Sequence, residues 1–528
     1  MIKNLIDKLA SPLKKALSAK AFLKGLGKRV ELTPQAHGID HSLVDERAVK
    51  VVQTLVEAGF EAYIVGGAVR DLLLGLRPKD FDVATNATPE EVKSLFRRAF
   101  IIGRRFRIVH VVFGRGRDHE VIEVSTFRAL IDSTSATQIS GNEKTSKGEL
   151  AGKTHAVDAE GRILRDNVWG PQNQDAARRD FTVNAMYYNP ITQVLVDYHG
   201  GVKDTQKKLL RMIGDPAARY REDPVRILRA VRFAAKLEFQ IEPKTRSPIQ
   251  DMLGLLENVP QSRTFDEMIK LLQTGHSLAS LEALRKHGLL GQGVFPILDA
   301  VLDASISEQR LHFIRIALTD TDRRVAEGKP VAPSFMLACM LWHDVLDRWE
   351  QLKRTGELPF PALQQAVYSV FDARIGDISG RGKLGADMRE IWMMQPRFER
   401  RVGSGPFTLV DHPRFRAGFD FLRLRADAKE LPDELADWWE DFSLGNEEER
   451  RALIDVARDQ DTARRAASIA AAKPKNKAPA AAPTPNTKSE SLTPTDPPAK
   501  KRRRRRRKPT ADEGLSEIAA PDAPDSRD

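Results

Sequence analysis

Residues 62–82 read Ala-Tyr-Ile-Val-Gly-Gly-Ala-Val-Arg-Asp-Leu-Leu-Leu-Gly-Leu-Arg-Pro-Lys-Asp-Phe-Asp. The apolar residues 62–65 predict a strand that runs into the glycine pair. Residues 81–83 predict a second strand, on which Asp82 lies two positions after Asp80. Side chains two positions apart on a strand point to the same face, so the two carboxylates are expected to lie side by side.

The surrounding sequence continues this alternation of strand and helix. Residues 108–113 and 121–124 are further strand candidates. A helix is expected to begin at Thr88, because the residues that follow it complete a capping box. Residues 131–160 are rich in Ser, Thr, Gly and Lys, which predicts a mobile insertion.

The acidic pair Asp80 and Asp82 suits a divalent cation. Two neighbouring carboxylates repel each other unless a cation neutralises them, and Mg²⁺ binds to a few carboxylates together with substrate phosphates. Two such ions could activate a hydroxyl and stabilise a departing pyrophosphate. Because Asp-x-Asp is also common in solvated loops and at strand edges, the interpretation depends on the neighbouring segments.

The glycine turn before the acidic pair favours phosphate binding. Gly66 and Gly67 allow the backbone to approach a phosphate, and the following helix offers free N–H groups. Arg70 adds a fork of hydrogen-bond donors. A plain strand-to-helix turn is the structural alternative, but the acidic pair downstream favours a phosphate site.

Two arginine-containing segments follow later in the chain. In residues 178–185, Arg179 and Asp180 are adjacent and could orient a nucleotide phosphate or the metal site. In residues 221–229, Arg226 and Arg229 are three positions apart and share a helix face, where they could hold a triphosphate or a base edge. A surface salt bridge and a solvated charged helix are the respective alternatives.

In order and spacing, these four motifs resemble the class II nucleotidyltransferase family, which contains the tRNA CCA-adding enzymes and the bacterial poly(A) polymerases. The resemblance implies an α+β fold: a polymerase-β-like head with helices on a mixed sheet, then an all-α neck, body and leg. It implies Mg²⁺ at Asp80 and Asp82, with Asp180 as a further catalytic residue. The nucleotide-binding residues that it implies are Gly66, Gly67, Arg70, Arg179, Arg226 and Arg229.

Residues 103–111, Gly-Arg-Arg-Phe-Arg-Ile-Val-His-Val, are similar to the segment that marks bacterial poly(A) polymerases. Arg104, Arg105 and Arg107 within it are candidate RNA contacts, and charges at a strand edge are the alternative. The resemblance therefore implies template-independent polyadenylation. In this reaction AMP from ATP is joined to an RNA 3′ hydroxyl with release of pyrophosphate, which promotes RNA decay and turnover.

Other activities stay open at this point. CCA addition to tRNA is the alternative, because the segment from Glu222 to Arg226 also resembles the CCA-adding enzymes. A non-catalytic RNA-binding protein of the same fold is a second alternative, which the intact acidic pair disfavours. Glu123 fits an additional active-site acid and an exposed strand position equally well. His343 and Asp344 lack suitable partner ligands, so we interpret them as a helix pair and not a metal site.

The chain has 528 residues, too many for one compact core. The predicted regions are a basic N-terminal extension at 1–40, a catalytic head at 41–203, a helical neck that binds RNA and nucleotide at 204–275, a helical RNA-binding body and leg at 276–460, and a disordered Arg/Lys-rich tail at 461–528. The tail is rich in Ala, Pro, Lys and Arg, so it cannot bury enough apolar area to offset the conformational entropy lost on folding. The single cysteine, Cys339, lies in an apolar stretch, which predicts a buried thiol and fits a reducing bacterial cytoplasm.

The net charge of +11 is concentrated at the two ends of the chain. Residues 500–508 are an unbroken run of nine bases. A flexible polycation holds RNA by its phosphates, and without interleaved aromatic residues it does not read bases. A solubilising tail is the alternative. The candidate RNA contacts in this run are Lys500, Lys501, Arg502, Arg503, Arg504, Arg505, Arg506, Arg507 and Lys508.

Residues 1–29 hold eight bases and one acid, with apolar residues at helical spacing between the lysines. A helix at a membrane surface and a loosely ordered extension both fit this pattern, and we favour the extension. Besides RNA 3′ ends and ATP, the expected partners are the RNA-degradation machinery or an RNA chaperone. No stable oligomer is required.

Overall fold

The computed structural model describes residues 25–472, with gaps at 104–106, 115–118, 131–136, 139–154, 158–162, 167, 304–306 and 376–381. For the described residues between these gaps from 137 to 166, and for residues 465–472, only the backbone is described. The chain consists of two units, residues 1–463 and 464–528. Apart from the end of one helix, all described residues belong to the first unit.

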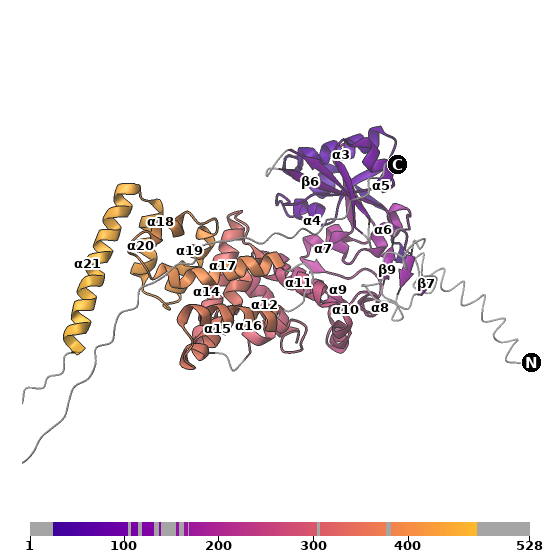
Figure 1. Cartoon of the computed structure of the whole chain (residues 1–528). Helices are drawn as coiled ribbons and strands as arrows, with labels where there is room; N and C mark the ends of the chain where they lie inside the picture. The colour runs from indigo at the N-terminus through magenta and orange to yellow at the C-terminus, as the bar shows by residue number, and fades with distance from the viewer. Residues whose placement is uncertain are drawn as a thin grey trace, which may run out of the picture. The chain divides into compact units, whose positions relative to one another are not determined.

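An eight-stranded mixed sheet forms the N-terminal head (Figure 1). In spatial order its strands are β1 (Val30–Leu32), β11 (Val194–Asp197), β10 (Met186–Asn189), β2 (Ala62–Val65), β3 (Asp82–Thr85), β6 (Glu120–Thr126), β5 (Ile108–Phe113) and β4 (Ala99–Ile102). Strands β3 and β6 are parallel, and all other neighbours are antiparallel. The strands predicted at 62–65 and 108–113 are confirmed, and those at 81–83 and 121–124 correspond to β3 and β6.

Side chains directly opposite one another across a sheet point to the same face. From β11 to β4 the register gives one such row, which consists of Val196, Tyr187, Val65, Asp82, Glu123, His110 and Phe100. The three members on β11, β10 and β2 are buried, whereas the members on β3, β6 and β4 are exposed. Strand β3 therefore stands where the row changes from buried apolar side chains to side chains that are open to solvent, the first two of them acidic.

Helices cover the two faces of the sheet unequally. On the face opposite the row, α3 (Glu46–Glu57) and α5 (Pro89–Leu95) close a core that includes Val52, Val92 and Val124. The capping box predicted at Thr88 is present at the start of α5. On the face of the row, α6 (Gln172–Arg178) places Ala176 in a smaller core with the buried row members on β11, β10 and β2.

The remaining head elements are short. They are α2 (Pro34–His37), η1 (His41–Leu43), α4 (Gly67–Leu73), β7 (Thr137–Gln138), β8 (His155–Val157), β9 (Ile163–Asp166), η3 (Thr182–Asn184) and α7 (Gly201–Gln206). Strand β1 and helix α2 belong to the head, which therefore begins before the predicted boundary at residue 41. A three-residue strand has no periodicity of its own, and β1 is stabilised by its pairing with β11.

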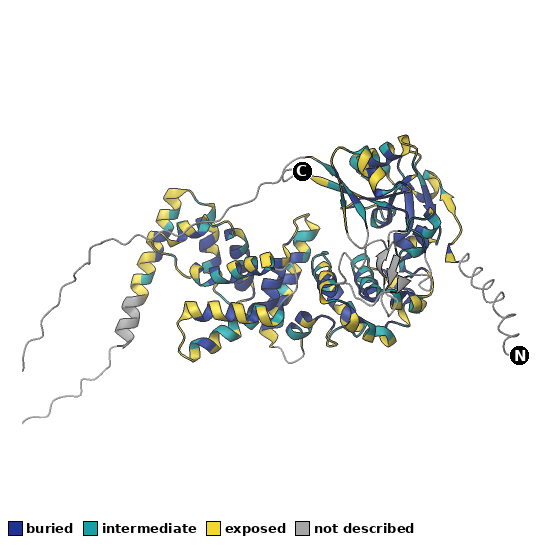
Figure 2. Ribbon diagram, turned by 45° about the vertical axis from the view of Figure 1, so that its right-hand side comes forward, coloured by how far each residue is buried: buried dark blue, intermediate teal, exposed yellow. Residues whose placement is uncertain are grey.

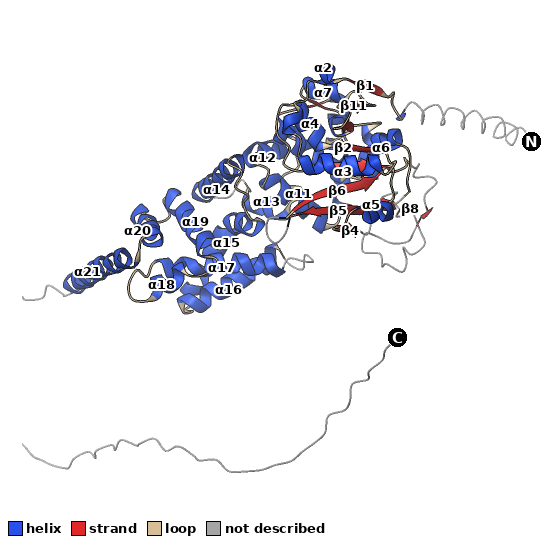
Figure 3. Ribbon diagram, turned by 90° about the horizontal axis from the view of Figure 1, so that it is seen from above, coloured by secondary structure: helices blue, strands red, loops and turns tan. Residues whose placement is uncertain are grey.

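Among the described residues, the rest of the first unit is helical apart from the two-residue strands β12 (Leu209–Leu210) and β13 (Gln240–Ile241), in line with the sequence pattern. Its elements are α8 (Pro216–Glu222), α9 (Val225–Leu237), α10 (Pro243–Arg246), η4 (Gln250–Asn258), α11 (Gln261–Leu272), α12 (Ser277–Lys286), α13 (Pro296–Val301), α14 (Glu308–Ala326), α15 (Pro333–Arg354), α16 (Pro359–Arg374), α17 (Gly382–Phe398), α18 (Gly405–Val410), α19 (Phe415–Asp427), α20 (Asp433–Leu444) and α21 (Glu447–Ala472). Figure 3 shows strands in the head and only helices from α11 onward.

One large hydrophobic core links the helices that were predicted as neck and body. It contains residues from Phe181 to Ala428, whereas residues from Met394 to Ala457 contribute to a separate core at the C-terminal end. Figure 2 shows buried residues of these helices in dark blue. Cys339 is buried in the large core, as predicted, and burial raises the pKa of its thiol. The boundary at 275 therefore does not correspond to a change of core.

Helix α21 continues past the predicted boundary at residue 460, to Ala472. The alanines in this stretch have high helix propensity, which extends the helix beyond the last residues of the core. The predicted disorder from residue 473 onward lies outside the described residues. Among the described helices, none combines the length and the apolar character needed to cross a membrane.

Candidate active site

A pocket of about 770 Å³ opens between the acidic strand and helix α9. This volume is within the range of pockets that bind small molecules such as nucleotides. Its charged lining residues are Arg70, Asp71, Lys79, Asp80, Asp82, Arg128, Asp175, Arg178, Arg179, Asp180, Asp223, Arg226, Arg229, Arg232, Lys236 and Lys270. Cations predominate, so the pocket as a whole attracts an anion.

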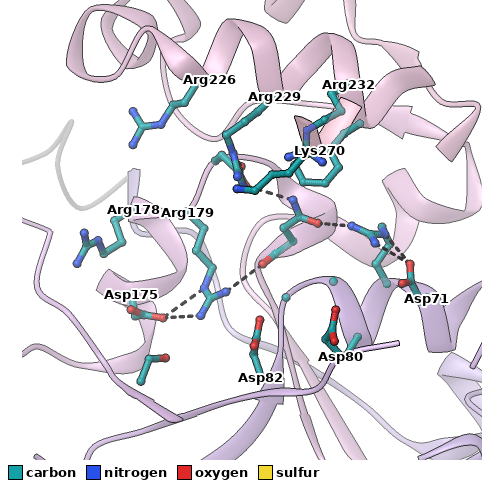
Figure 4. Close-up of a pocket in the computed structure, with 18 of the residues that line it drawn as sticks. Asp71, Asp80, Asp82, Asp175, Arg178, Arg179, Arg226, Arg229, Arg232 and Lys270 are labelled. Carbon is teal, nitrogen blue, oxygen red and sulfur yellow. Dashed lines mark hydrogen bonds and ion pairs between the residues drawn. The ribbon is translucent and has the colours of Figure 1, made fainter. Parts of the chain in front are cut away.

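Asp80 and Asp82 lie together on one wall of the pocket (Figure 4). No hydrogen bond or ion pair joins either carboxylate to another described side chain. The side chain of Asp82 reaches solvent, but the protein around it removes part of its hydration. This desolvation, the charge of Glu123 and that of Asp80 raise the pKa of Asp82 to about 6, although Arg179 opposes the shift. The carboxylates of Asp80 and Asp82 therefore place negative charge on this wall that no ion pair with a described side chain neutralises.

The glycine turn brings backbone and an arginine to the same pocket. Gly66 has φ +73°, a conformation that favours glycine, and helix α4 begins directly after it. The guanidinium of Arg70 is buried and donates to Asp71 at 2.7 Å and to the side-chain oxygen of Asn184 at 2.7 Å. These bonds fix the fork of Arg70 at the edge of the pocket.

Arg179 and Asp180 lie at the turn between α6 and η3. Arg179 donates to the carboxylate of Asp175 at 3.1 Å and lies over the ring of Tyr187, 5.3 Å from its centre. Asp180 accepts bonds from Arg229 at 2.6 and 2.9 Å, from Asn184 at 3.2 Å and from the Phe181 amide at 2.8 Å. Burial alone would raise the pKa of Asp180, but these partners, Arg229 first, lower it to about 2.

The pocket-facing side of α9 carries Arg226, Arg229, Arg232 and Lys236, three or four positions apart (Figure 4 labels the three arginines). Arg226 donates to Glu222 at 2.7 Å and to the Arg219 carbonyl oxygen at 2.9 Å. This face of α9 therefore forms a cationic wall on the side of the pocket opposite the acidic pair.

Arg219 connects α8 to the arginine turn. Its guanidinium is buried and donates to the carbonyl oxygens of Arg178 and Arg179 at 2.5 and 2.8 Å, and to Glu222 at 2.7 Å. Glu222 is thus shared between Arg219 and Arg226. The sequence did not single out Arg219 as a site residue, yet it joins the two arginine segments of the pocket.

The donor set of the acidic wall fits Mg²⁺. Two carboxylates without partners among the described side chains offer the hard oxygen ligands that this ion prefers, and substrate phosphates and water complete its coordination. Among the described residues, no cluster of three or more His, Cys, Asp or Glu side chains could hold a metal by itself. An ion at Asp80 and Asp82 would therefore be shared with the substrate.

All the predicted catalytic and nucleotide-binding residues line this one pocket, and among them Gly66 and Gly67 contribute backbone. Arg107 forms an ion pair with Glu90, and Glu123 lies 3.2 Å from His110. His343 contacts Glu430 at 3.0 Å, and Asp344 pairs with Arg310 and Arg374. The predictions for Arg104, Arg105, residues 500–508 and most of the N-terminal 29 residues lie outside the described residues.

Several pocket residues were missed by the sequence analysis. Arg232 and Lys236 continue the spacing of Arg226 and Arg229, so the helical periodicity could have identified them. Asp175 and Lys270 come from α6 and α11 and have no local signal, because only the fold brings them to the pocket.

Comparison with known protein families agrees with this geometry. Residues 62–211, which include the acidic strand and the arginine turn, match the family described as Poly A polymerase head domain. This match makes the head that of a nucleotidyltransferase. Residues 238–302 match Probable RNA and SrmB- binding site of polymerase A, and residues 355–509 match Polymerase A arginine-rich C-terminus.

Relatives that align with most of the chain narrow the class of nucleotidyltransferase. The chain is 44% identical to Poly(A) polymerase I of Haemophilus influenzae over 77% of its length and 86% of the relative, and 39% identical to that of Salmonella typhi over 84% and 91%. A CCA-adding enzyme of Lactobacillus helveticus is 38% identical, but over 44% of this chain and 51% of that enzyme. The chain belongs to the bacterial poly(A) polymerase I family of polynucleotide adenylyltransferases.

Proposed function

We propose that this enzyme adds AMP from ATP to RNA 3′ ends without a template, by a two-metal mechanism, in a bacterial cytoplasm where the tails promote RNA decay. The observation that carries the proposal is the pair Asp80 and Asp82, unpartnered among the described residues, on one wall of a pocket whose opposite wall is cationic. Acidic groups on one side and arginines on the other fit a metal-bound triphosphate.

The cationic residues hold the triphosphate in this proposal. Arg70, Arg179, Arg226 and Arg229 all line the pocket and neutralise the phosphate charges, while the glycine turn lets the chain approach them. Because hydrogen bonds to Asp71, Asp175, Glu222 and Asp180 hold the four arginines before substrate arrives, little reorganisation is needed.

Asp80 and Asp82 hold Mg²⁺, which when bound supplies charge neutralisation at the transferred phosphoryl group and lowers the pKa of the RNA 3′ hydroxyl. The carboxylate of Asp180 is already occupied by Arg229, Asn184 and a backbone amide. We therefore assign Asp180 the role of positioning Arg229 against the nucleotide, and not that of a metal ligand.

The choice of nucleotide is tested by offering each NTP separately to the full-length enzyme, with an oligoadenylate and with a tRNA that lacks its terminal CCA. We expect long tails from ATP on the oligoadenylate and little incorporation from CTP. This test is needed because the segment Glu222–Arg226, with the pattern Glu-Asp-x-x-Arg, also resembles the CCA-adding enzymes. If the enzyme instead added two C and one A, and only to the tRNA, its activity would be CCA addition and not polyadenylation.

We further propose that residues 500–508 retain RNA during tailing. Each phosphate contact made by a cation on single-stranded RNA contributes about 0.7 to the dependence of log affinity on log salt. Deletion of residues 500–508 should therefore weaken RNA binding at low salt and flatten this dependence, as measured by fluorescence anisotropy over a salt series. An identical slope in both proteins would show that the run has another role.

A further inference from the structure

The half of the sheet face beyond Asp82 carries an exposed aromatic edge. In the row that crosses the sheet, Asp82 is followed by Glu123, His110 and Phe100. Phe100 is 56% exposed, and Ile102, two positions along β4 on the same face, is 37% exposed. The opposite face of these strands is buried beneath α3 and α5. The exposed ring therefore shares a face of the sheet with the carboxylate of Asp82.

Two other directions from the acidic pair are occupied by described helices. Toward β2, the face is covered by α6, whose Ala176 packs with Val65 and Tyr187. Opposite the acidic pair stands α9, whose arginines are assigned to the nucleotide. Toward β4, the row members Glu123 and Phe100 are exposed, so RNA whose 3′ hydroxyl reacts at the acidic pair can follow the path across β6 and β5.

The length of this path suits single-stranded RNA. Strands are about 4.8 Å apart, so Phe100 lies three spacings, roughly 14 Å, from Asp82, which spans about two to four nucleotides at 3.4 Å or more each. Arg97 and Arg98, both exposed, directly precede β4, and the Arg98 guanidinium also donates to the carbonyl oxygen of Gly114. Between the acidic pair and the ring, the charge of Glu123 faces His110 at 3.2 Å.

We propose that Phe100 and Ile102 form a stacking platform for a base a few nucleotides upstream of the RNA 3′ end. The flat ring receives the base, and Arg97 and Arg98 attract the phosphates beside it. Stacking tolerates any base, which suits an enzyme whose acceptor grows with each addition. The proposal rests on the proposed function, because it requires RNA as the acceptor.

The first test compares Phe100→Ala with Phe100→Trp in the full-length enzyme. We expect Phe100→Ala to raise the KM for an oligoadenylate primer by roughly 5- to 20-fold, whereas the KM for ATP and the kcat at saturating primer stay unchanged. Phe100→Trp should retain wild-type primer KM. Ile191→Ala, at another exposed apolar side chain of the head, is the matched control and should have no effect.

The second test locates the stacked base. Oligoadenylates with a single abasic site at successive positions from the 3′ end are offered to both enzymes. Wild type should lose affinity at the position that stacks on Phe100, and Phe100→Ala should show no further loss there. An unchanged primer KM in Phe100→Ala, or equal abasic effects in both enzymes, would overturn the platform. Failure of the proposed function would differ, because wild type would then extend no oligoadenylate with ATP.

Discussion

Asp82→Asn should reduce AMP incorporation by on the order of 10³-fold or more, because the amide keeps the shape but loses the charge that holds Mg²⁺. Affinity for RNA should stay close to that of wild type, since the cationic residues are unchanged. Incorporation of labelled ATP into an oligoadenylate, with RNA binding measured in parallel, gives both values. Glu120→Gln, at an exposed carboxylate on the same sheet but facing the other way, should leave the reaction intact.

Asp80→Asn should cause a loss of the same order as Asp82→Asn. If the two carboxylates act as one metal site, the double variant should be little worse than either single variant, because the site is already lost. Full activity in Asp80→Asn or Asp82→Asn would refute the assignment of the acidic pair. Losses that simply multiply would indicate two independent roles for these side chains.

The acidic pair could be placed from the sequence because its signals are local. The apolar run before the glycines predicted β2, and the capping box predicted the start of α5. Both depend on residues a few positions apart, where propensity and side-chain geometry are well defined. Strand β3 begins at Asp82, so only Asp82 takes its direction from the strand, whereas Asp80 reaches the same pocket from the bend before it. The proximity of the two carboxylates follows from their spacing along the chain, and the common strand expected for them was wrong.

The partners of the site residues could not be predicted in this way. Asp180 and Arg229 are separated by 49 positions, yet their ion pair occupies the carboxylate that the sequence suggested for catalysis. Lys270 reaches the pocket from α11, where its sequence neighbours are those of any charged helix surface. Contacts of this kind depend on how helices pack, which single-sequence periodicity does not specify.

Glu430→Gln should lower the free energy of unfolding by about 3 kcal/mol, because it removes a buried charge and leaves its cation unpaired. The carboxylate, 5% exposed, accepts from Arg425 at 3.1 Å and from the Trp342 indole at 3.1 Å, and lies 3.0 Å from His343. These contacts tie the end of α19 to α15, far along the chain from the acidic pair.

Urea unfolding with matched variants separates the charge effect from a general loss of packing. Glu447→Gln, which breaks an exposed pair with Arg451, should cost only a small fraction of the loss in Glu430→Gln. Adding Arg425→Met to Glu430→Gln should recover part of the stability, because no unpaired charge remains buried. An equal cost for Glu430→Gln and Glu447→Gln would contradict a buried ion pair.

The pH dependence gives an independent check on Glu430. Burial would raise the pKa of this carboxyl, but His343, Arg425 and Trp342 together lower it below its ordinary value of 4.5. A carboxyl with a lowered pKa in the folded state stabilises the protein above its unfolded-state pKa, and this stabilisation is lost as the pH falls through the folded-state value. The advantage of wild type over Glu430→Gln should therefore be complete at neutral pH and shrink below about pH 4.5. A difference in unfolding free energy that stays constant into the acid range would show that packing, and not charge, makes Glu430 stabilising.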